Sequence, residues 1–175
     1  MRYRRADVAG GTYFFTVNLA DRKAELLTRH IDDLREVMNK VKQAHPFVIE
    51  AMVVLPEHLH AIWRLPSNDV DFPMRWSLIK AGFSRRIDKT EHIRASRQAK
   101  RERGIWQRRY WEHFIRDEND FERHVDYIHF NPVKHGYVSH AIDWPFSTFH
   151  RYIERGILPA DWGDGAVNIA AGGER

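Results

Sequence analysis

The alternation of hydrophobic and polar residues along the chain predicts four strands. One segment is apolar on both faces except at Glu50, as in an interior strand. The segment after it alternates strictly, so that His58 and His60 share one face and Leu59 lies on the other. Two further segments are rich in aromatic or β-branched residues, which favours strands. We therefore expect strands over residues 12–19, 47–55, 58–65 and 105–115.

Apolar residues at helical spacing predict the helices between and after these strands. Between Leu34 and Val41, four apolar residues recur at i, i+3, i+4 and i+7, which is one face of a helix. Asp117 is a favourable N-cap, and Pro46 and Pro132 are each expected to end a helix because the residue before proline avoids the α region. We expect helices over 28–44, 72–88, 117–131 and 148–155, and an exposed helix or a loop over 90–103.

This order of elements favours an α+β fold. The order βαββαβα, with a hairpin at its centre, suggests an antiparallel sheet with helices packed on one side, similar to ferredoxin-like folds. The length of 175 residues suits one domain. We expect this domain to cover residues 1–162, and residues 163–175, which are rich in Gly and Ala, to form a disordered tail.

Composition excludes several classes of protein. The chain has no cysteine, which excludes disulfides, thiolate zinc sites, iron–sulfur clusters and cysteine nucleophiles, and fits a reducing compartment. The longest apolar run, 47–55, is far shorter than the roughly 20 residues that span a bilayer. The basic start of the chain is not followed by an apolar segment, so we expect neither a signal peptide nor a membrane association.

Positive charge is concentrated in one part of the chain. The net charge is +4, yet residues 85–109 hold ten Lys/Arg and three Asp/Glu, which gives +7 there and −3 elsewhere. This pattern indicates either a polyanion partner or a solvated basic helix. Trp106, Tyr110 and Trp111 would serve equally as base-stacking residues or as core. The candidate phosphate contacts are Arg4, Arg5, Arg85, Arg86, Lys89, Arg108 and Arg109.

His58 and His60 are candidate metal ligands. Residues i and i+2 of a strand project from the same face about 6.5–7 Å apart, so two imidazoles can converge on one ion. The alternative is the polar, solvated face of an edge strand, which this pair alone does not exclude.

Tyr127 is a candidate nucleophile on the helix expected over 117–131. Asp120, His124, Tyr127 and Asn131 form a polar stripe beside an apolar one. A tyrosine hydroxyl near a metal can attack phosphorus and form a covalent phosphoester. The alternative is a tyrosine at a helix–sheet boundary with its hydroxyl in water.

Five segments of the chain together form a recognisable set of motifs. The segments are Gly10–Val17 (GGTYFFTV), Val53–His60 (VVLPEHLH), Trp106–His113 (WQRRYWEH), His124–Gly136 (HVDYIHFNPVKHG) and Asp143–Thr148 (DWPFST). Together they resemble the REP-associated tyrosine transposases, which belong to the His-hydrophobic-His (HUH) single-tyrosine, IS200-like transposase superfamily. The similarity covers about residues 3–162, and its order and spacing are more specific than His-x-His alone.

The resemblance implies a fold, an activity and a set of site residues. Enzymes of this family cut single-stranded DNA beside hairpins of repeated extragenic palindromes, leaving a 5′-phosphotyrosine and a free 3′-OH. By position, Tyr127 would be the nucleophile, and His58, His60 and Asn131 would bind Mg²⁺ or Mn²⁺. The resemblance also implies an HUH transposase-like sandwich, a bacterial cytoplasmic protein associated with the nucleoid, and a monomer, although the residues themselves do not decide the oligomeric state.

Two other functions fit the same residues. The chain could be a catalytically silent regulator that binds hairpins, or a metal-dependent phosphodiesterase that uses water and does not need Tyr127. The presence of His58, His60 and Tyr127 together favours the transposase.

Overall fold

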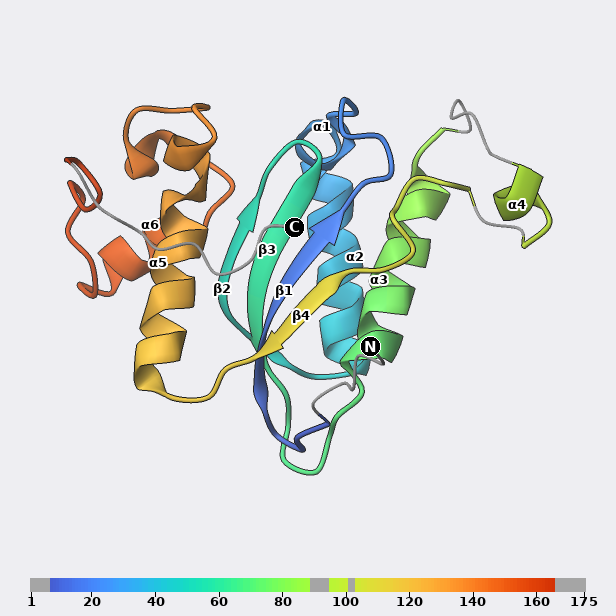
Figure 1. Cartoon of the computed structure of the whole chain (residues 1–175), viewed down its shortest axis with the longest axis horizontal. Coiled ribbons are helices and arrows are strands. Elements are labelled where there is room, and N and C mark those ends of the chain that lie inside the picture. The colour runs from blue at the N-terminus through green and yellow to red at the C-terminus, as the bar shows by residue number, and fades with distance from the viewer. Residues whose placement is uncertain (1–6, 89–94, 101–102, 166–175) are drawn as a thin grey trace, which may run out of the picture.

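The computed structural model describes residues 7–88, 95–100 and 103–165. Four strands form the centre of the molecule and helices surround them (Figure 1). The elements are β1 (Thr12–Asn18), α1 (Leu26–Arg29), α2 (Ile31–Ala44), β2 (Val48–Val54), β3 (His58–Arg64), α3 (Phe72–Arg86), α4 (Ala95–Gln98), β4 (Trp111–Phe114), α5 (Glu118–Lys134), a 3₁₀ turn (Ala141–Asp143) and α6 (Phe149–Glu154).

The four strands make one antiparallel sheet in the order β2-β3-β1-β4. This confirms the α+β class and the expected hairpin, which is β2 and β3. Within the sheet, Thr16 of β1 is paired with His60 of β3 on one side and with Trp111 of β4 on the other. Because opposed residues of an antiparallel sheet share a face, these three side chains lie on the same face.

Helices cover both faces of the sheet, so the expectation that they lie on one side is wrong. The helices α2 and α3 pack on one face, where Phe15 and Trp63 belong to the larger core (Figure 1). The helix α5 packs on β2 and β3 from the other face, where Phe14 and Ile62 meet Ile128. The physical reason is that β1 carries large apolar residues at consecutive positions, and each face then needs its own cover.

The helix α5 runs through Pro132 to Lys134, so the expectation that Pro132 ends it is also wrong. Proline inside a helix removes a backbone donor and costs about 3 kcal/mol. Here the last turn is closed by other bonds, since His135 N donates to Asn131 O and Tyr137 N donates to Pro132 O. The N-terminus of α5 agrees with the expectation, because the Asp117 side chain accepts from Asp120 N at 2.8 Å.

Two other elements differ in length from the expectation. The helix expected over 28–44 is divided at His30 into α1 and α2. The strand expected over 105–115 is shortened to β4, because the chain before it packs against α3. Trp106 Nε1 donates to Lys80 O at 3.2 Å, and Lys80 Nζ donates to Gln107 O at 3.0 Å. These bonds hold residues 106–107 on the helix.

Several expectations concern residues outside the described ranges. Arg4, Arg5 and Lys89 lie there, as do most of the tail expected over 163–175 and part of the 90–103 stretch. Among the described residues of the tail, Asp164 contacts His140 Nδ1 at 2.8 Å. In the described part of the chain, no helix has the length and apolarity needed to cross a membrane.

Candidate active site

His58 and His60 lie on the interior strand β3, on the face that α5 covers. Their exposed fractions are 1% and 0%, and their ring centroids lie 4.9 Å apart. The alternative of a solvated edge strand is therefore wrong. Buried imidazoles on the polar face of a strand need partners, and the neighbouring residues supply them.

Each histidine uses its Nδ1 atom in a hydrogen bond to a neighbouring residue. His58 Nδ1 lies 2.8 Å from Glu57 Oε1, and His60 Nδ1 lies 2.7 Å from Thr16 Oγ1. Such contacts fix the ring orientation of metal-binding histidines and assign Nε2 as the nitrogen that would face the metal. Burial lowers the pKa of His58 against the opposing effect of Glu57, which favours the neutral imidazole that binds metal.

Tyr127 of α5 lies directly against His60. The two ring centroids are 5.1 Å apart with an angle of 71° between the ring planes, and Tyr127 is 2% exposed. Its hydroxyl oxygen is buried, so the alternative of a hydroxyl in water is wrong. The Lys134 ammonium lies 4.9 Å from the centroid of the Tyr127 ring, which places a positive charge beside the phenol.

Asn131 is also buried on α5, one helical turn after Tyr127. It is 0% exposed, and in the described part of the chain neither Oδ1 nor Nδ2 has a hydrogen-bond partner. An unsatisfied buried amide costs roughly 1–3 kcal/mol, so its presence calls for a partner. An amide oxygen and two imidazoles together are a suitable donor set for a divalent metal, so these residue types fit the expected ion.

Three residues near this group were missed by the sequence analysis. Thr16 orients His60, Lys134 lies over Tyr127, and the ring of His135 lies 5.3 Å from that of His58. Lys134 and His135 were missed because the helix was expected to end at Pro132. A helix that continues to Lys134 places it seven residues after Tyr127, and this spacing repeats the same face.

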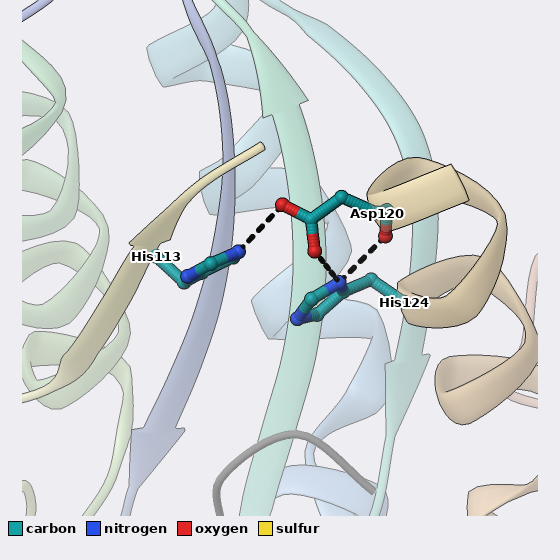
Figure 2. Close-up of side chains that lie close together, drawn as sticks. All are labelled: His113, Asp120 and His124. Atoms are coloured by element: carbon teal, nitrogen blue, oxygen red, sulfur yellow. Dashed lines mark hydrogen bonds and ion pairs between the residues drawn. The ribbon is translucent and has the colours of Figure 1, made fainter. Parts of the chain in front are cut away.

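A second polar cluster lies at the other end of α5, between that helix and β4. His113, Asp120 and His124 each offer one ligand atom, and these atoms lie within 4.8 Å of one another (Figure 2). His113 Nε2 is 2.8 Å from Asp120 Oδ2, and His124 Nδ1 is 3.3 Å from Asp120 Oδ1. The spacing is compatible with one metal ion.

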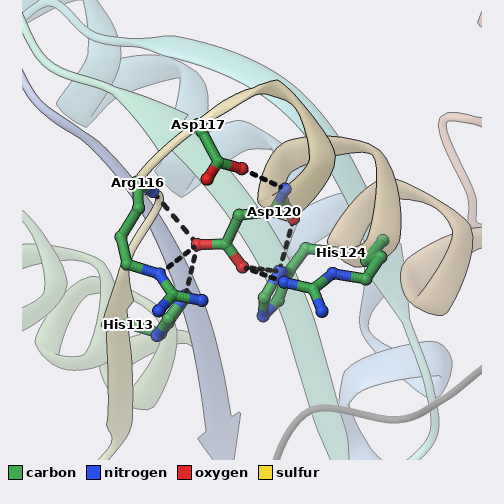
Figure 3. A network of polar contacts seen from close by, with 6 residues as sticks. His113, Arg116, Asp117, Asp120 and His124 are labelled. Carbon is green, nitrogen blue, oxygen red and sulfur yellow. Dashed lines mark hydrogen bonds and ion pairs between the residues drawn. The ribbon is translucent and has the colours of Figure 1, made fainter.

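Two arginines favour a different interpretation of this cluster. Arg116 Nε lies 3.3 Å from Asp120 Oδ2 (Figure 3). Arg123 Nη2 lies 3.4 Å from Asp120 Oδ1. A divalent ion would meet two guanidinium charges against one carboxylate. Burial opposes ionisation of Asp120, but the bonds from the Arg116 backbone and from His113 outweigh it and hold the pKa of this carboxyl below its usual range. We therefore interpret the cluster as an ion-pair network.

The candidate phosphate contacts fall into three groups. Arg86 bonds to Asp33 and Glu36 of α2 at 3.3 and 2.6 Å, and this pairing lowers the pKa of Glu36 to about 2. Arg86 thus joins α3 to α2. The exposed residues among the candidates are Arg85, Arg108 and Arg109, and those outside the described ranges are Arg4, Arg5 and Lys89.

The three candidate stacking residues have different environments. Trp106 is 7% exposed and belongs to the core. Tyr110 is half-buried and packs against the same core, with Lys80 Nζ 5.1 Å from its ring centroid. Trp111 is 43% exposed on β4. Only Trp111 of the three therefore presents much of its surface to solvent.

Comparison with known proteins identifies relatives over nearly the whole chain. The family described as "Transposase IS200 like" matches residues 10–131. A REP-associated tyrosine transposase of Escherichia coli (strain K12) is 49% identical over 170 residues, which are 97% of this chain and 95% of the relative. The solved structure of a REP-associated tyrosine transposase bound to a REP hairpin is 47% identical and covers 100% of this chain and 98% of its own, with a TM-score of 0.83.

Proposed function

The chain belongs to the IS200-like transposases and, among these, to the REP-associated tyrosine transposases, and we propose that it cuts and rejoins single-stranded DNA at hairpins of repeated extragenic palindromes. One observation within the chain supports this most directly. The phenol of Tyr127 lies against His60, and His60 in turn lies beside His58 in the interior of the protein. A nucleophile and a metal-binding pair are thereby combined in one place.

His58, His60 and Asn131 would hold the divalent metal ion. When bound, the ion would supply positive charge that polarises the phosphate and stabilises the charge developing on it. A donor set of two imidazoles and one amide oxygen suits Mn²⁺, whereas Mg²⁺ prefers shells of oxygen, and we propose that either ion serves. Glu57 and Thr16 keep the two imidazoles in position through their Nδ1 atoms.

Tyr127 would carry the covalent step. Its phenolic oxygen forms a bond to phosphorus as the phenolic proton leaves, and the bond from phosphorus to the 3′ oxygen of the preceding nucleotide breaks. That oxygen takes up a proton and departs as a 3′-OH, while the 5′ end stays on the enzyme as a phosphotyrosine. Attack by a 3′-OH on this phosphotyrosine reverses the step and joins two strands. Lys134 would favour the negative charge that develops on the phenolic oxygen.

The partner and the place of action follow from this function. The partner would be a single-stranded DNA hairpin of the palindromic type, and the exposed basic residues Arg85, Arg108 and Arg109 would contact its phosphates. We propose that one copy acts alone, in the bacterial cytoplasm and at the nucleoid.

Neither alternative is favoured. A water-using phosphodiesterase gives no role to Tyr127 beside the histidines, and a catalytically silent regulator gives no role to the buried donor set. The named relatives are transposases, which agrees with a tyrosine nucleophile.

One experiment separates the three functions. Labelled single-stranded hairpin DNA is incubated with the protein and Mn²⁺, and covalent adducts are sought on a denaturing gel. We expect an adduct with the wild type and none with Tyr127→Phe. Tyr137→Phe is the matched control, because Tyr137 also lies close by, with its hydroxyl 3.3 Å from Glu57 Oε2.

The other outcomes of this experiment would contradict the proposal. Cleavage that survives Tyr127→Phe would identify water as the nucleophile. Hairpin binding by the wild type without any cleavage would identify a regulator.

A further inference from the structure

The end of α5 that carries the Asp120 network also presents a polar and aromatic surface to solvent. We call it the β4–α5 patch, and it consists of Trp111, His113, Arg116 and Arg123. Trp111 is 43% exposed, and the side chains of Arg116 and Arg123 are 64% and 60% exposed. His113 is half-buried and contacts Asp120 (Figure 3). The proposed function uses none of these four residues.

The register of the sheet places Trp111 on the same face as the candidate active site. Thr16 is opposite both His60 and Trp111, and Thr16 Oγ1 contacts His60 Nδ1. Neighbouring strands are 4.7–4.9 Å apart, so the backbones of Trp111 and His60 are separated by about 10 Å. The exposed indole therefore lies two strands from the histidine pair, on the same face of the sheet.

The two arginines are held in place by a buried carboxylate. Asp120 is 1% exposed and accepts from both Arg116 and Arg123, so their guanidinium groups are anchored at one end and solvated at the other. An anchored arginine loses less side-chain entropy when it binds a phosphate than a free one does. This arrangement favours anion binding at the surface of the patch.

Charge is divided between two sides of α5. At about 100° per residue, Arg123, Tyr127 and Lys134 fall within about 40° of one another. The acidic residues Glu118, Glu122 and Asp126 fall about 100–180° away from Tyr127 on the same projection. Asp120 lies on the side of Tyr127, but it is buried and paired with Arg116 and Arg123. Positive side chains therefore precede and follow the tyrosine on its own side of the helix, and that side complements a nucleic-acid backbone.

We propose that the β4–α5 patch binds the single-stranded segment of DNA that leads from the hairpin into the active site. Trp111 stacks on a base of this segment, and Arg116 and Arg123 contact its phosphates. Exposed aromatic residues beside arginines are the usual means of holding single strands without reading their sequence. This inference rests on the proposed function and assigns to it a binding surface for one part of the substrate.

The test compares hairpins with and without single-stranded extensions, in a Tyr127→Phe background so that cleavage does not interfere. We expect Trp111→Ala to weaken binding of an extended hairpin roughly ten-fold and to change the affinity for a blunt hairpin by no more than about two-fold. Trp111→Phe keeps an aromatic ring and should restore most of the lost affinity. The fluorescence of a 2-aminopurine in the extension should be quenched by the protein that carries Trp111, and not by the Trp111→Ala variant. Extensions on the 5′ and 3′ sides are tested separately.

The arginines are tested by the salt dependence of binding. Arg116→Ala and Arg123→Ala should each reduce the slope of log K against log salt by about one for the extended hairpin. The matched control is Arg35→Ala on α2, an arginine with a 54% exposed side chain on the opposite face of the sheet, which should leave the slope unchanged.

Failure of the patch is distinct from failure of the proposed function. If Trp111→Ala weakens blunt and extended hairpins equally, or weakens neither, the patch does not bind the single strand and the inference is overturned. If the parent protein binds no hairpin at all, both this inference and the proposed function are wrong. Thermal unfolding of each variant shows that the fold is kept.

Discussion

The ring of Tyr127 stands nearly perpendicular to that of His60, with 5.1 Å between their centroids. Phe14 of β1 also contacts both rings, at 5.6 and 5.9 Å, and so limits how either can turn. The phenol and the imidazole come from different layers of the fold, a helix and the sheet beneath it. Their relative position thus depends on how α5 packs on the sheet, and not on a local turn.

Replacement of the two histidines tests the metal site. We expect His58→Ala with His60→Ala to abolish cleavage and largely spare hairpin binding. Mn²⁺ at about 100 times its Kd should stabilise the wild type by about 2.7 kcal/mol, and EDTA or the double variant should remove this effect. Differential scanning calorimetry measures it, with His140→Ala, an exposed histidine, as the control. Equal loss of binding and cleavage would show that the histidines hold the fold.

Replacing Asn131 with an apolar residue should raise the stability of the metal-free protein and lower its activity. Asn131→Leu keeps the volume and removes an unsatisfied buried amide, so we expect the metal-free protein to become more stable by about 1 kcal/mol. The same change should weaken Mn²⁺ binding and slow cleavage about ten-fold or more, whereas Asn131→Asp keeps an oxygen ligand and should retain Mn²⁺ binding. Urea unfolding and Mn²⁺ titration measure the two effects. A destabilised Leu variant with unchanged Mn²⁺ affinity would show that the amide is structural.

Lys134 should act on the covalent step more than on DNA binding. Its ammonium lies over the Tyr127 ring, so Lys134→Met should slow adduct formation roughly ten-fold at saturating DNA, while Lys134→Arg keeps the charge and most of the rate. Single-turnover kinetics with labelled hairpin measure the rate. A change in Kd alone, with the saturating rate intact, would assign Lys134 to binding.

Asp120 should make stability depend on acid pH. Because its pKa is lower in the folded than in the unfolded protein, its contribution is present above about pH 4 and is lost as pH falls toward the lowered folded value. Asp120→Asn should cost about 3 kcal/mol at pH 7. The difference from the wild type should narrow by up to about 1.4 kcal/mol for each pH unit below about 4. Urea unfolding at pH 7, 4 and 3 measures it, with exposed Asp164→Asn as control.

A constant difference between Asp120→Asn and the wild type over this pH range would contradict the assignment. The carboxylate would then not be ionised in the network described above.

The sheet, and which candidate residues share a face, could be predicted from periodicity because both depend on local spacing. The alternation through His58 and His60 identified their shared face, and helical spacing placed Tyr127 and Asn131 together. Periodicity does not show which element, if any, covers a given face of the sheet. The polar face of β3 was equally compatible with solvent, and only the packing of α5 shows that it is buried.

The errors arose where tertiary contacts override local preference. Pro132 is unfavourable in a helix, yet the bonds to Asn131 O and Pro132 O close the turn, and Lys134 is carried into the site. The charge count could not show that Arg86 pairs with Glu36 and Asp33, which are 50 and 53 positions away and too distant in sequence for local reasoning. The same count did not identify Arg116 and Arg123, because these two residues lie outside residues 85–109.

The burial of the candidate site has a kinetic consequence. Because His58, His60, Tyr127 and Asn131 are at most 2% exposed, we expect neighbouring groups to move before a phosphodiester reaches the Tyr127 oxygen. Some rearrangement must precede transesterification. The turnover rate at saturating DNA should then be set by that rearrangement. Substrates that differ only in the reactivity of their leaving oxygen should therefore have the same maximal rate.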